Sequence, residues 1–265
     1  MEEDDPEMKT NTPEDAEALI QKLSSDMGIH RNPRKGTLNA PEEILESMEF
    51  DEQIFVSEIF PDEFSLEKTH DRISSNTEDI LDYGRPLVSI GGDHSVTFPV
   101  LEALKEKFPD MKLVWLDSHL DLKEKVDGHV SHDVVVRELV EKEIFRPEEI
   151  VFVGVTRTDH DEEKFLDEHD IQIYRPEEVD LFLDEWSSGE ACYLSVDIDV
   201  LEESEAPGTG YPDGQLSVQE VEKVIEKTSP RYSDIVEVAP SLDREKVTVE
   251  NARKILSLLV SEATD

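Results

Sequence analysis

Short runs of apolar, β-branched residues alternate along the chain with longer segments in which apolar residues recur every three or four positions. The runs have the length of strands and are almost continuously apolar, which is typical of strands buried on both faces of a sheet. Strands are predicted at 86–90, 112–117, 149–155, 171–174, 192–199 and 234–239, and helices at 95–107, 132–143, 161–169, 176–186, 217–228 and 247–262. The alternation predicts an α/β fold of three layers, in which a central, mostly parallel sheet lies between two layers of helices.

The first third of the chain has a less regular pattern. Residues 1–12 are polar and acidic, and we expect them to be flexible. From Thr12 the segment TPEDAEALIQKL is expected to form a capped helix with Pro13 at its first position. A short helix near 41–48, a strand at 53–60 and a helix at 64–82 are expected to follow. The sequence contains no repeat or interdomain linker, so we expect residues 13–265 to form one catalytic domain.

The charge balance is extreme, since 66 acidic residues face 26 lysines and arginines and give a formal charge of -40. The acids are spread along the whole chain rather than gathered in a tail. This indicates a surface adapted to a salt-rich cytoplasm, as in halophiles, where concentrated salt screens the self-repulsion. A partner with basic patches is the alternative. Nucleic-acid binding is disfavoured, because no basic stripe is available to neutralise phosphates.

The sequence also bears on the cellular compartment. A single cysteine, Cys192, excludes an internal disulfide and favours a reducing compartment. No apolar run approaches the ~20 residues needed to span a bilayer. The first residues, MEEDDPEMKT, lack the basic and apolar regions of a signal peptide. We therefore expect a cytoplasmic protein without membrane contacts.

Chemically reactive side chains gather just after several of the predicted strands. In open parallel sheets, ligands bind beyond the carboxyl ends of the strands. The motifs GGDHS (91–95), DSHLD (117–121) and DID (197–199) lie at such ends, as does Glu237. Within the second and third motifs the reactive residues alternate, which places them on one face of an extended chain. The candidate metal ligands are His94, Asp117, His119, Asp121, Asp197 and Asp199.

This set of residue types favours a pair of metal ions. Four carboxylates in one dry pocket would repel one another, and divalent cations would remove that cost. Six ligands exceed the needs of one ion, so two ions that share bridging carboxylates fit better. Carboxylates and imidazoles without cysteine favour Mn²⁺ over a structural zinc site. Each motif alone has an ordinary alternative as a helix cap, a tight turn or a solvated acid; their joint occurrence at one sheet edge is the stronger argument.

These motifs, together with SVDIDVLEESEAPGTGYP (195–212) and EVAP (237–240), resemble the successive signatures of the ureohydrolases, the arginase and agmatinase family. The segment RKGTLNAPEEI (34–44) is a fainter match, and the usual first strand is not recognisable around 13–35. The resemblance implies an arginase-like fold, two Mn²⁺ ions and a homo-oligomer, either a trimer or a hexamer. It implies that one ion is held by His94, Asp117, Asp121 and Asp197, and the other by Asp117, His119, Asp197 and Asp199.

The same resemblance implies catalytic and substrate-binding residues. His132 aligns with the histidine that moves protons near the substrate, and Glu237 aligns with the acid that meets the guanidinium group. Asp121 is expected to orient the attacking water. The residues alone leave other interpretations open. His132 fits a surface position at a helix start that Ser131 would cap, with His129 as a weaker competitor, and Glu237 fits a buried strand acid with a structural partner.

The resemblance implies metal-dependent hydrolysis of a linear amidine, in which a guanidino compound gives urea and an amine. The stretch DSHLDLKEKVDG is similar to archaeal agmatinases and favours agmatine, which would give putrescine for polyamine biosynthesis. Arginine, guanidinobutyrate and formimidoylglutamate are alternative substrates. Lys123 and Lys125 would either meet a substrate carboxylate or stay solvated. A non-catalytic metal-binding regulatory or assembly subunit is the alternative from another class, and a urea assay with manganese separates the two.

Overall fold

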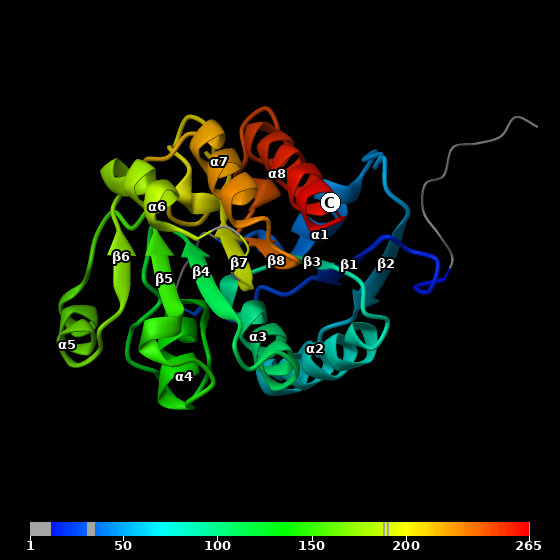
Figure 1. Ribbon diagram of the computed structural model, residues 1–265. Helices are drawn as coiled ribbons and strands as arrows, with labels where there is room; N and C mark the ends of the chain where they lie inside the picture. The colour runs from blue at the N-terminus through cyan, green and yellow to red at the C-terminus, as the bar shows by residue number, and fades with distance from the viewer. Residues whose placement is uncertain (1–11, 31–34, 188, 190, 265) are drawn as a thin grey trace, which may run out of the picture.

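The computed structural model describes residues 12–30, 35–187, 189 and 191–264. They form one eight-stranded sheet in which every pair of neighbouring strands is parallel, with helices on both faces (Figure 1). The three-layer α/β fold predicted from the sequence is therefore confirmed. The prediction of a flexible segment over residues 1–12 lies outside the described residues, apart from Thr12.

The elements follow one another in regular alternation from β3 onward. The strands are β1 (Ala18–Leu23), β2 (Ile54–Ile59), β3 (Leu87–Gly91), β4 (Lys112–Leu116), β5 (Ile150–Val153), β6 (Gln172–Tyr174), β7 (Cys192–Asp197) and β8 (Tyr232–Val236). The helices are α1 (Ala40–Leu45), α2 (Leu66–Leu81), α3 (Thr97–Lys107), α4 (Val135–Glu141), α5 (His160–Glu168), α6 (Val179–Glu185), α7 (Val218–Thr228) and α8 (Val247–Thr264). Across the sheet the strand order is β2-β1-β3-β8-β7-β4-β5-β6.

Both faces of the sheet carry an apolar core. Helices α1, α6, α7 and α8 cover one face, and α2, α3, α4 and α5 cover the other (Figure 1). Successive strand residues point to opposite cores, as in β4, where Val114 and Leu116 pack under the first layer and Leu113 and Trp115 under the second. This double burial explains the nearly continuous apolar runs, because each buried side chain stabilises the fold by roughly 1.5–3 kcal/mol.

The helix predicted from Thr12 is wrong, because this part of the chain forms β1. All six residues of β1 are buried, and the strand pairs with β2 on one side and β3 on the other. The polar residues that gave the segment a helical appearance have partners: Gln21 donates to Thr77 at 3.0 Å, and Lys22 forms an ion pair with Glu42 at 2.6 Å. Pairing on both sides thus overrides local helix propensity. It also supplies the early strand that the sequence did not reveal.

Four strands in the middle of the sheet, β3, β8, β7 and β4, are direct neighbours. Because all four are parallel, their carboxyl ends meet at one edge. The motifs singled out in the sequence follow these four strands, so the fold brings them together there. Within the described part of the chain, no helix has the length and apolar character needed to cross a bilayer.

Candidate metal centre

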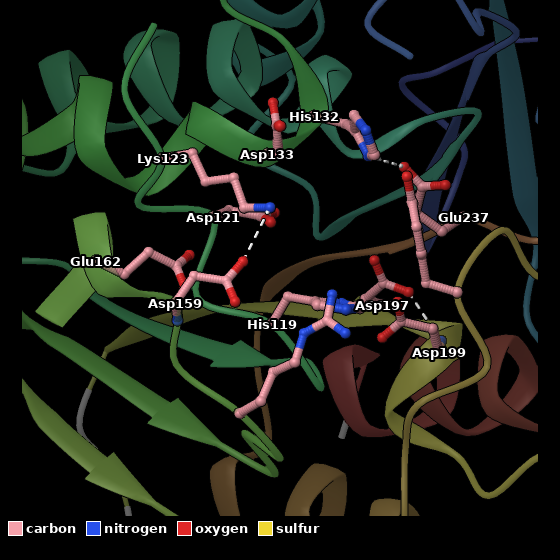
Figure 2. Close-up of a pocket in the computed structure, with 12 residues that line it drawn as sticks. His119, Asp121, Lys123, His132, Asp133, Asp159, Glu162, Asp197, Asp199 and Glu237 are labelled. Atoms are coloured by element: carbon pink, nitrogen blue, oxygen red, sulfur yellow. Dashed lines mark hydrogen bonds and ion pairs between the residues drawn. The ribbon is translucent and has the colours of Figure 1, made fainter. Parts of the chain in front are cut away.

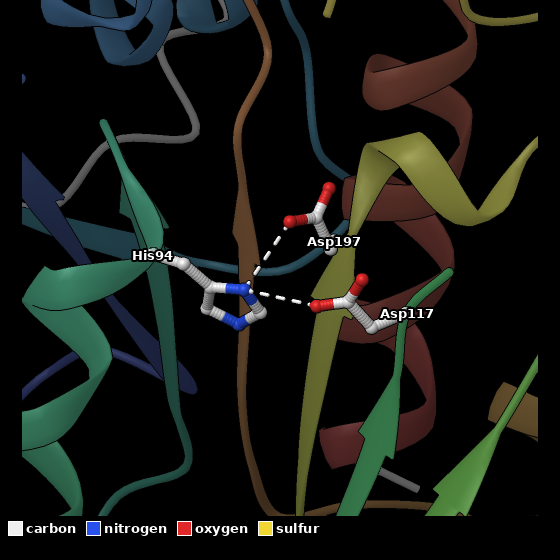
Figure 3. Close-up of side chains that lie close together, drawn as sticks. All are labelled: His94, Asp117 and Asp197. Carbon is white, nitrogen blue, oxygen red and sulfur yellow. Dashed lines mark ion pairs between the residues drawn. The ribbon is translucent and has the colours of Figure 1, made fainter. Parts of the chain in front are cut away.

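The first group of candidate ligands surrounds one ring nitrogen of His94, which begins a 3-10 turn after β3. The Nδ1 atom lies 3.2 Å from Oδ2 of Asp117, 3.2 Å from Oδ2 of Asp197 and 3.3 Å from Oδ2 of Asp121. Figure 3 shows two of these carboxylates converging on the nitrogen. His94, Asp117 and Asp197 have ligand atoms close enough to one another to bind a single ion.

The second group is built around His119 and shares Asp117 with the first. Nδ1 of His119 lies 3.0 Å from Oδ2 of Asp199 and 3.5 Å from Oδ1 of Asp117. The two oxygens of Asp117 therefore face different histidines, which is the arrangement expected of a carboxylate that bridges two ions. The structure thus brings all six predicted ligands into one cluster.

The spacing of the acids has a different physical basis from the one expected. The ligands do not lie along an extended chain, because the backbone turns immediately after β4 and β7. At each turn the carboxylate accepts a hydrogen bond from the backbone N–H two residues later: His119 donates to Asp117 at 2.7 Å, and Asp199 donates to Asp197 at 2.8 Å. The alternation therefore reflects two local turns that fix the aspartates.

The donor set fits divalent metal ions. Nδ1 of His94 is buried and has no hydrogen-bond partner among the described residues, although it faces three carboxylates. Burial and then the charge of Asp117 raise the pKa of Asp121 to about 7. Burial and the charges of Asp199 and Asp117 raise the pKa of Asp197 well above its ordinary value. The charges of Asp117 and Asp199 thus oppose the ionisation of their neighbours Asp121 and Asp197, and two divalent ions would balance this negative charge.

Two carboxylates of the site, Asp121 and Glu237, are held on left-handed backbone. Their φ angles are 51° and 61°. This conformation costs a non-glycine residue about 1 kcal/mol and persists only where the surroundings impose it. Glu237 follows β8 directly, and its backbone N–H donates to the carbonyl of Gly92 at 2.9 Å. Both acids line the pocket, as does His132.

His132 and Glu237 form an ion pair across the pocket, with 3.3 Å between Nδ1 and Oε1 (Figure 2). The same Oε1 accepts a hydrogen bond from the backbone N–H of His94 at 2.9 Å. Burial works against a charged imidazole, but the hydrogen bond and charge of Glu237 raise the pKa of His132 to about 9. Ser131 makes no capping hydrogen bond, and its hydroxyl donates to Asp133.

The outer wall of the pocket is charged and includes residues that sequence reasoning missed. Lys123 lines it beside Asp159, 3.2 Å away (Figure 2), and Arg157 lines it while paired with Asp213 at 3.0 Å. Tyr211 completes this wall, with its ring 6.2 Å from that of His132. Arg157 and Asp159 follow β5 at the carboxyl edge, so the rule that identified the ligands would also have identified them.

Two residues that the sequence offered as candidates, Lys125 and His129, lie outside this pocket. Lys125 forms an ion pair with Glu138 and, like His129, lines a separate cavity between α2 and α4. Of the two lysines that the sequence left as candidate partners of a substrate carboxylate, only Lys123 lines the pocket. His132 rather than His129 therefore stands beside the ligand cluster.

Comparisons with known proteins agree with this architecture. A family model described as "Arginase family" matches residues 23–261. An agmatinase of Bacillus subtilis is 29% identical over 199 residues, 72% of this chain and 68% of that protein. A putative agmatinase of Clostridium difficile superposes with a TM-score of 0.84 at 26% identity, over 96% of this chain and 99% of that one. A Trypanosoma cruzi formiminoglutamase solved with Mn²⁺₂ has a TM-score of 0.84 at 20% identity, over 96% of both chains.

Proposed function

Because this chain belongs to the arginase family, we propose that it is a binuclear manganese hydrolase that cleaves a guanidino compound to urea and an amine. The observation that carries the proposal is the pair of ligand groups that share Asp117. The Mn²⁺₂ named for the Trypanosoma cruzi structure supports the choice of metal. We further propose that residues 13–265 act as one catalytic domain.

In the proposed reaction, the oxygen of a water forms a bond to the guanidinium carbon, and the bond from that carbon to the alkyl nitrogen breaks. Two Mn²⁺ ions held by the ligand cluster would polarise the water and balance the negative charge. Glu237 would pair with the planar cation and fix its angle to the water. Asp121 would accept a hydrogen bond from the water, and His132 would supply the proton that the leaving amine takes up.

His132 is suited to this role, since its raised pKa keeps a proton on the imidazole near neutral pH. Glu237 links the two halves of the site, because one of its oxygens faces His132 while accepting from the backbone of His94. The carboxylate that would hold the substrate is thus fixed to the segment that supplies a metal ligand. A guanidinium bound there would lie between the ligand cluster and the proton donor.

The proposed substrate is agmatine, and the outer wall of the pocket gives the argument for and against it. Asp159 and Asp133 would attract the amine at the far end of agmatine, and the named agmatinases support this choice. Lys123 and Arg157 favour a second candidate, a guanidino acid whose carboxylate would replace Asp159 or Asp213 as the partner of a cation. Both candidates undergo the same bond cleavage.

Replacing one ligand tests the metal-dependent reaction. In Asp199→Ala we expect urea release to be abolished and the manganese content to fall, because Asp199 is a ligand of the second group. Urea is measured colorimetrically and manganese by elemental analysis. Asp180→Ala, which removes an exposed acid on α6, is the matched control and should change neither value. Unchanged turnover in Asp199→Ala would refute the assignment.

The substrate is identified by a panel of agmatine, arginine, guanidinobutyrate and formimidoylglutamate, assayed in concentrated salt with added manganese. Agmatine is expected to give the highest kcat/KM. A preference for guanidinobutyrate would identify Lys123 and Arg157 as partners of the substrate carboxylate. Absence of urea from the three guanidino compounds and of formamide from formimidoylglutamate, in protein that carries manganese, would contradict the proposed function.

A further inference from the structure

A chain of buried hydrogen bonds runs from the back of His94 to an aspartate that lies outside the ligand cluster. Nε2 of His94 is 2.8 Å from Oγ of Ser195, in β7, and that hydroxyl donates to Oδ1 of Asp234, in β8, at 2.7 Å. Both Ser195 and Asp234 are fully buried. Neither residue lines the pocket. The chain therefore reaches the candidate metal centre from inside the sheet.

The direction of these hydrogen bonds follows from the number of hydrogens available. Three hydroxyls converge on Asp234, since Thr97 donates to it at 2.6 Å and Tyr193 at 2.8 Å, in addition to Ser195. An ionised carboxylate only accepts, so each hydroxyl gives it its single hydrogen. Burial raises the pKa of Asp234, and the three donated hydrogens act against that shift. With its hydrogen committed, Ser195 is left as an acceptor toward His94.

A hydroxyl that only accepts determines which nitrogen of His94 carries hydrogen. Nε2 has to donate to Ser195, so Nδ1 keeps its lone pair for a metal ion. The ring plane is fixed independently, because Trp115 stacks on His94 with 4.0 Å between centroids and 6° between planes. The indole N–H of Trp115 also donates to Asp117 at 3.0 Å. Tautomer and orientation of this ligand are thus set by different neighbours.

We propose that Asp234 is a positioning residue that acts through Ser195 to hold His94 in the tautomer that presents Nδ1 to the first of the two metal ions. This inference rests on the proposed binuclear site. Asp234 touches neither substrate nor metal, and its effect is on the affinity of one ion. The second group, built on His119, has no such link to Asp234, so the two ions should respond differently when the chain of hydrogen bonds is cut.

The test is a calorimetric titration of Mn²⁺ into metal-free protein. Ser195→Ala removes the link while leaving Asp234 with its two other donors. We expect it to weaken binding of one ion about 10–100-fold, the usual effect of removing a group that orients a metal-bound histidine, and to leave the other ion within about twofold. Tyr193→Phe is the matched control, because it removes a different hydroxyl from Asp234; both ions should then bind as in the wild type.

A second variant keeps the test independent of any packing change at position 195. Asp234→Asn has the same shape, but its amide can donate to Ser195, which reverses the hydrogen bond to His94 and should also weaken one ion. The inference is overturned if both Ser195→Ala and Asp234→Asn bind two ions with wild-type affinity, or if Tyr193→Phe weakens binding as much as they do. If the wild-type protein itself binds no manganese, the failure is that of the proposed function.

Discussion

Gly92 follows β3 directly and lies against Ser25, just after β1, so replacing it with alanine tests how the site is held together. A Cβ atom at this position would lie 1.7 Å from the carbonyl oxygen of Ser25. That carbonyl already accepts the N–H of Asp93 at 2.8 Å, and the carbonyl of Gly92 accepts the N–H of Glu237. The clash therefore falls on the contacts that join the end of β1, the GGDHS segment and Glu237.

The magnitude follows from the displacement that Gly92→Ala would force. Real Cβ atoms essentially never lie within 3.0 Å of such an atom, so one backbone segment has to move by more than about 1.3 Å, the difference between 3.0 and 1.7 Å. Overpacking of this kind costs about 1–3 kcal/mol, and a weakened hydrogen bond adds about 1 kcal/mol. The expected loss is about 2–4 kcal/mol. At about 2.1 cal/mol/K per residue, this lowers Tm by roughly 4–7 °C.

The assay is thermal unfolding followed by circular dichroism, in concentrated salt and without metal. Gly84→Ala is the matched control, because a Cβ there meets nothing within 4 Å and only the φ of +66° opposes the substitution. It should cost about 1 kcal/mol. We also expect Gly92→Ala to lower kcat, since Glu237 would shift with it. A Gly92→Ala protein as stable as Gly84→Ala would refute this account of the contact between Gly92 and Ser25.

Two further predictions concern charge. The formal charge of -40 should make the free energy of unfolding rise from dilute to molar KCl, and thermal melts showing a constant or falling Tm over that range would contradict a salt-adapted surface. In the metal-free protein, pairing with Glu237 raises the pKa of His132 from about 6.5 to about 9. The ion pair therefore contributes its full stabilisation below about pH 6.5, and this stabilisation is lost as the pH rises through 9. The stability difference between wild type and His132→Gln should therefore shrink over that interval, and a difference independent of pH would count against the ion pair.

Most of the sheet could be predicted because its strands carry an unambiguous signal. In β3, β4 and β7 nearly all residues are buried, on both faces of the sheet, which leaves almost continuous apolar runs in the sequence. β1 lacks that signal, since Gln21 and Lys22 interrupt it and an acidic segment precedes it. Their partners, Thr77 and Glu42, are distant in the sequence. A local pattern cannot reveal that a polar side chain will be satisfied by a residue so far along the chain.

The ligand cluster could be predicted for a related reason. Its residues occupy short motifs directly after strands, and the topology of a parallel sheet alone implies that such motifs meet. The outer wall of the pocket was harder to foresee. Tyr211 lies in the loop between β7 and α7, and the partner of Arg157, Asp213, comes from the same loop. Loop paths depend on contacts that no periodicity encodes. Asp234 could have been singled out from the sequence, because it is an acidic residue inside a strand predicted to be buried.

The strand order has a consequence for how the protein is made. β8 leaves the ribosome after the other seven strands of this sheet, yet it lies between β3 and β7 in the middle of the sheet. Before its synthesis, β2-β1-β3 and β7-β4-β5-β6 share no strand pairing, so the nascent chain holds two half-sheets with open inner edges. Such edges are prone to wrong association. The histidine of the first half and the acids of the second are joined only when residues 232–236 insert, so the candidate metal centre is assembled only after every other strand of the sheet has been made.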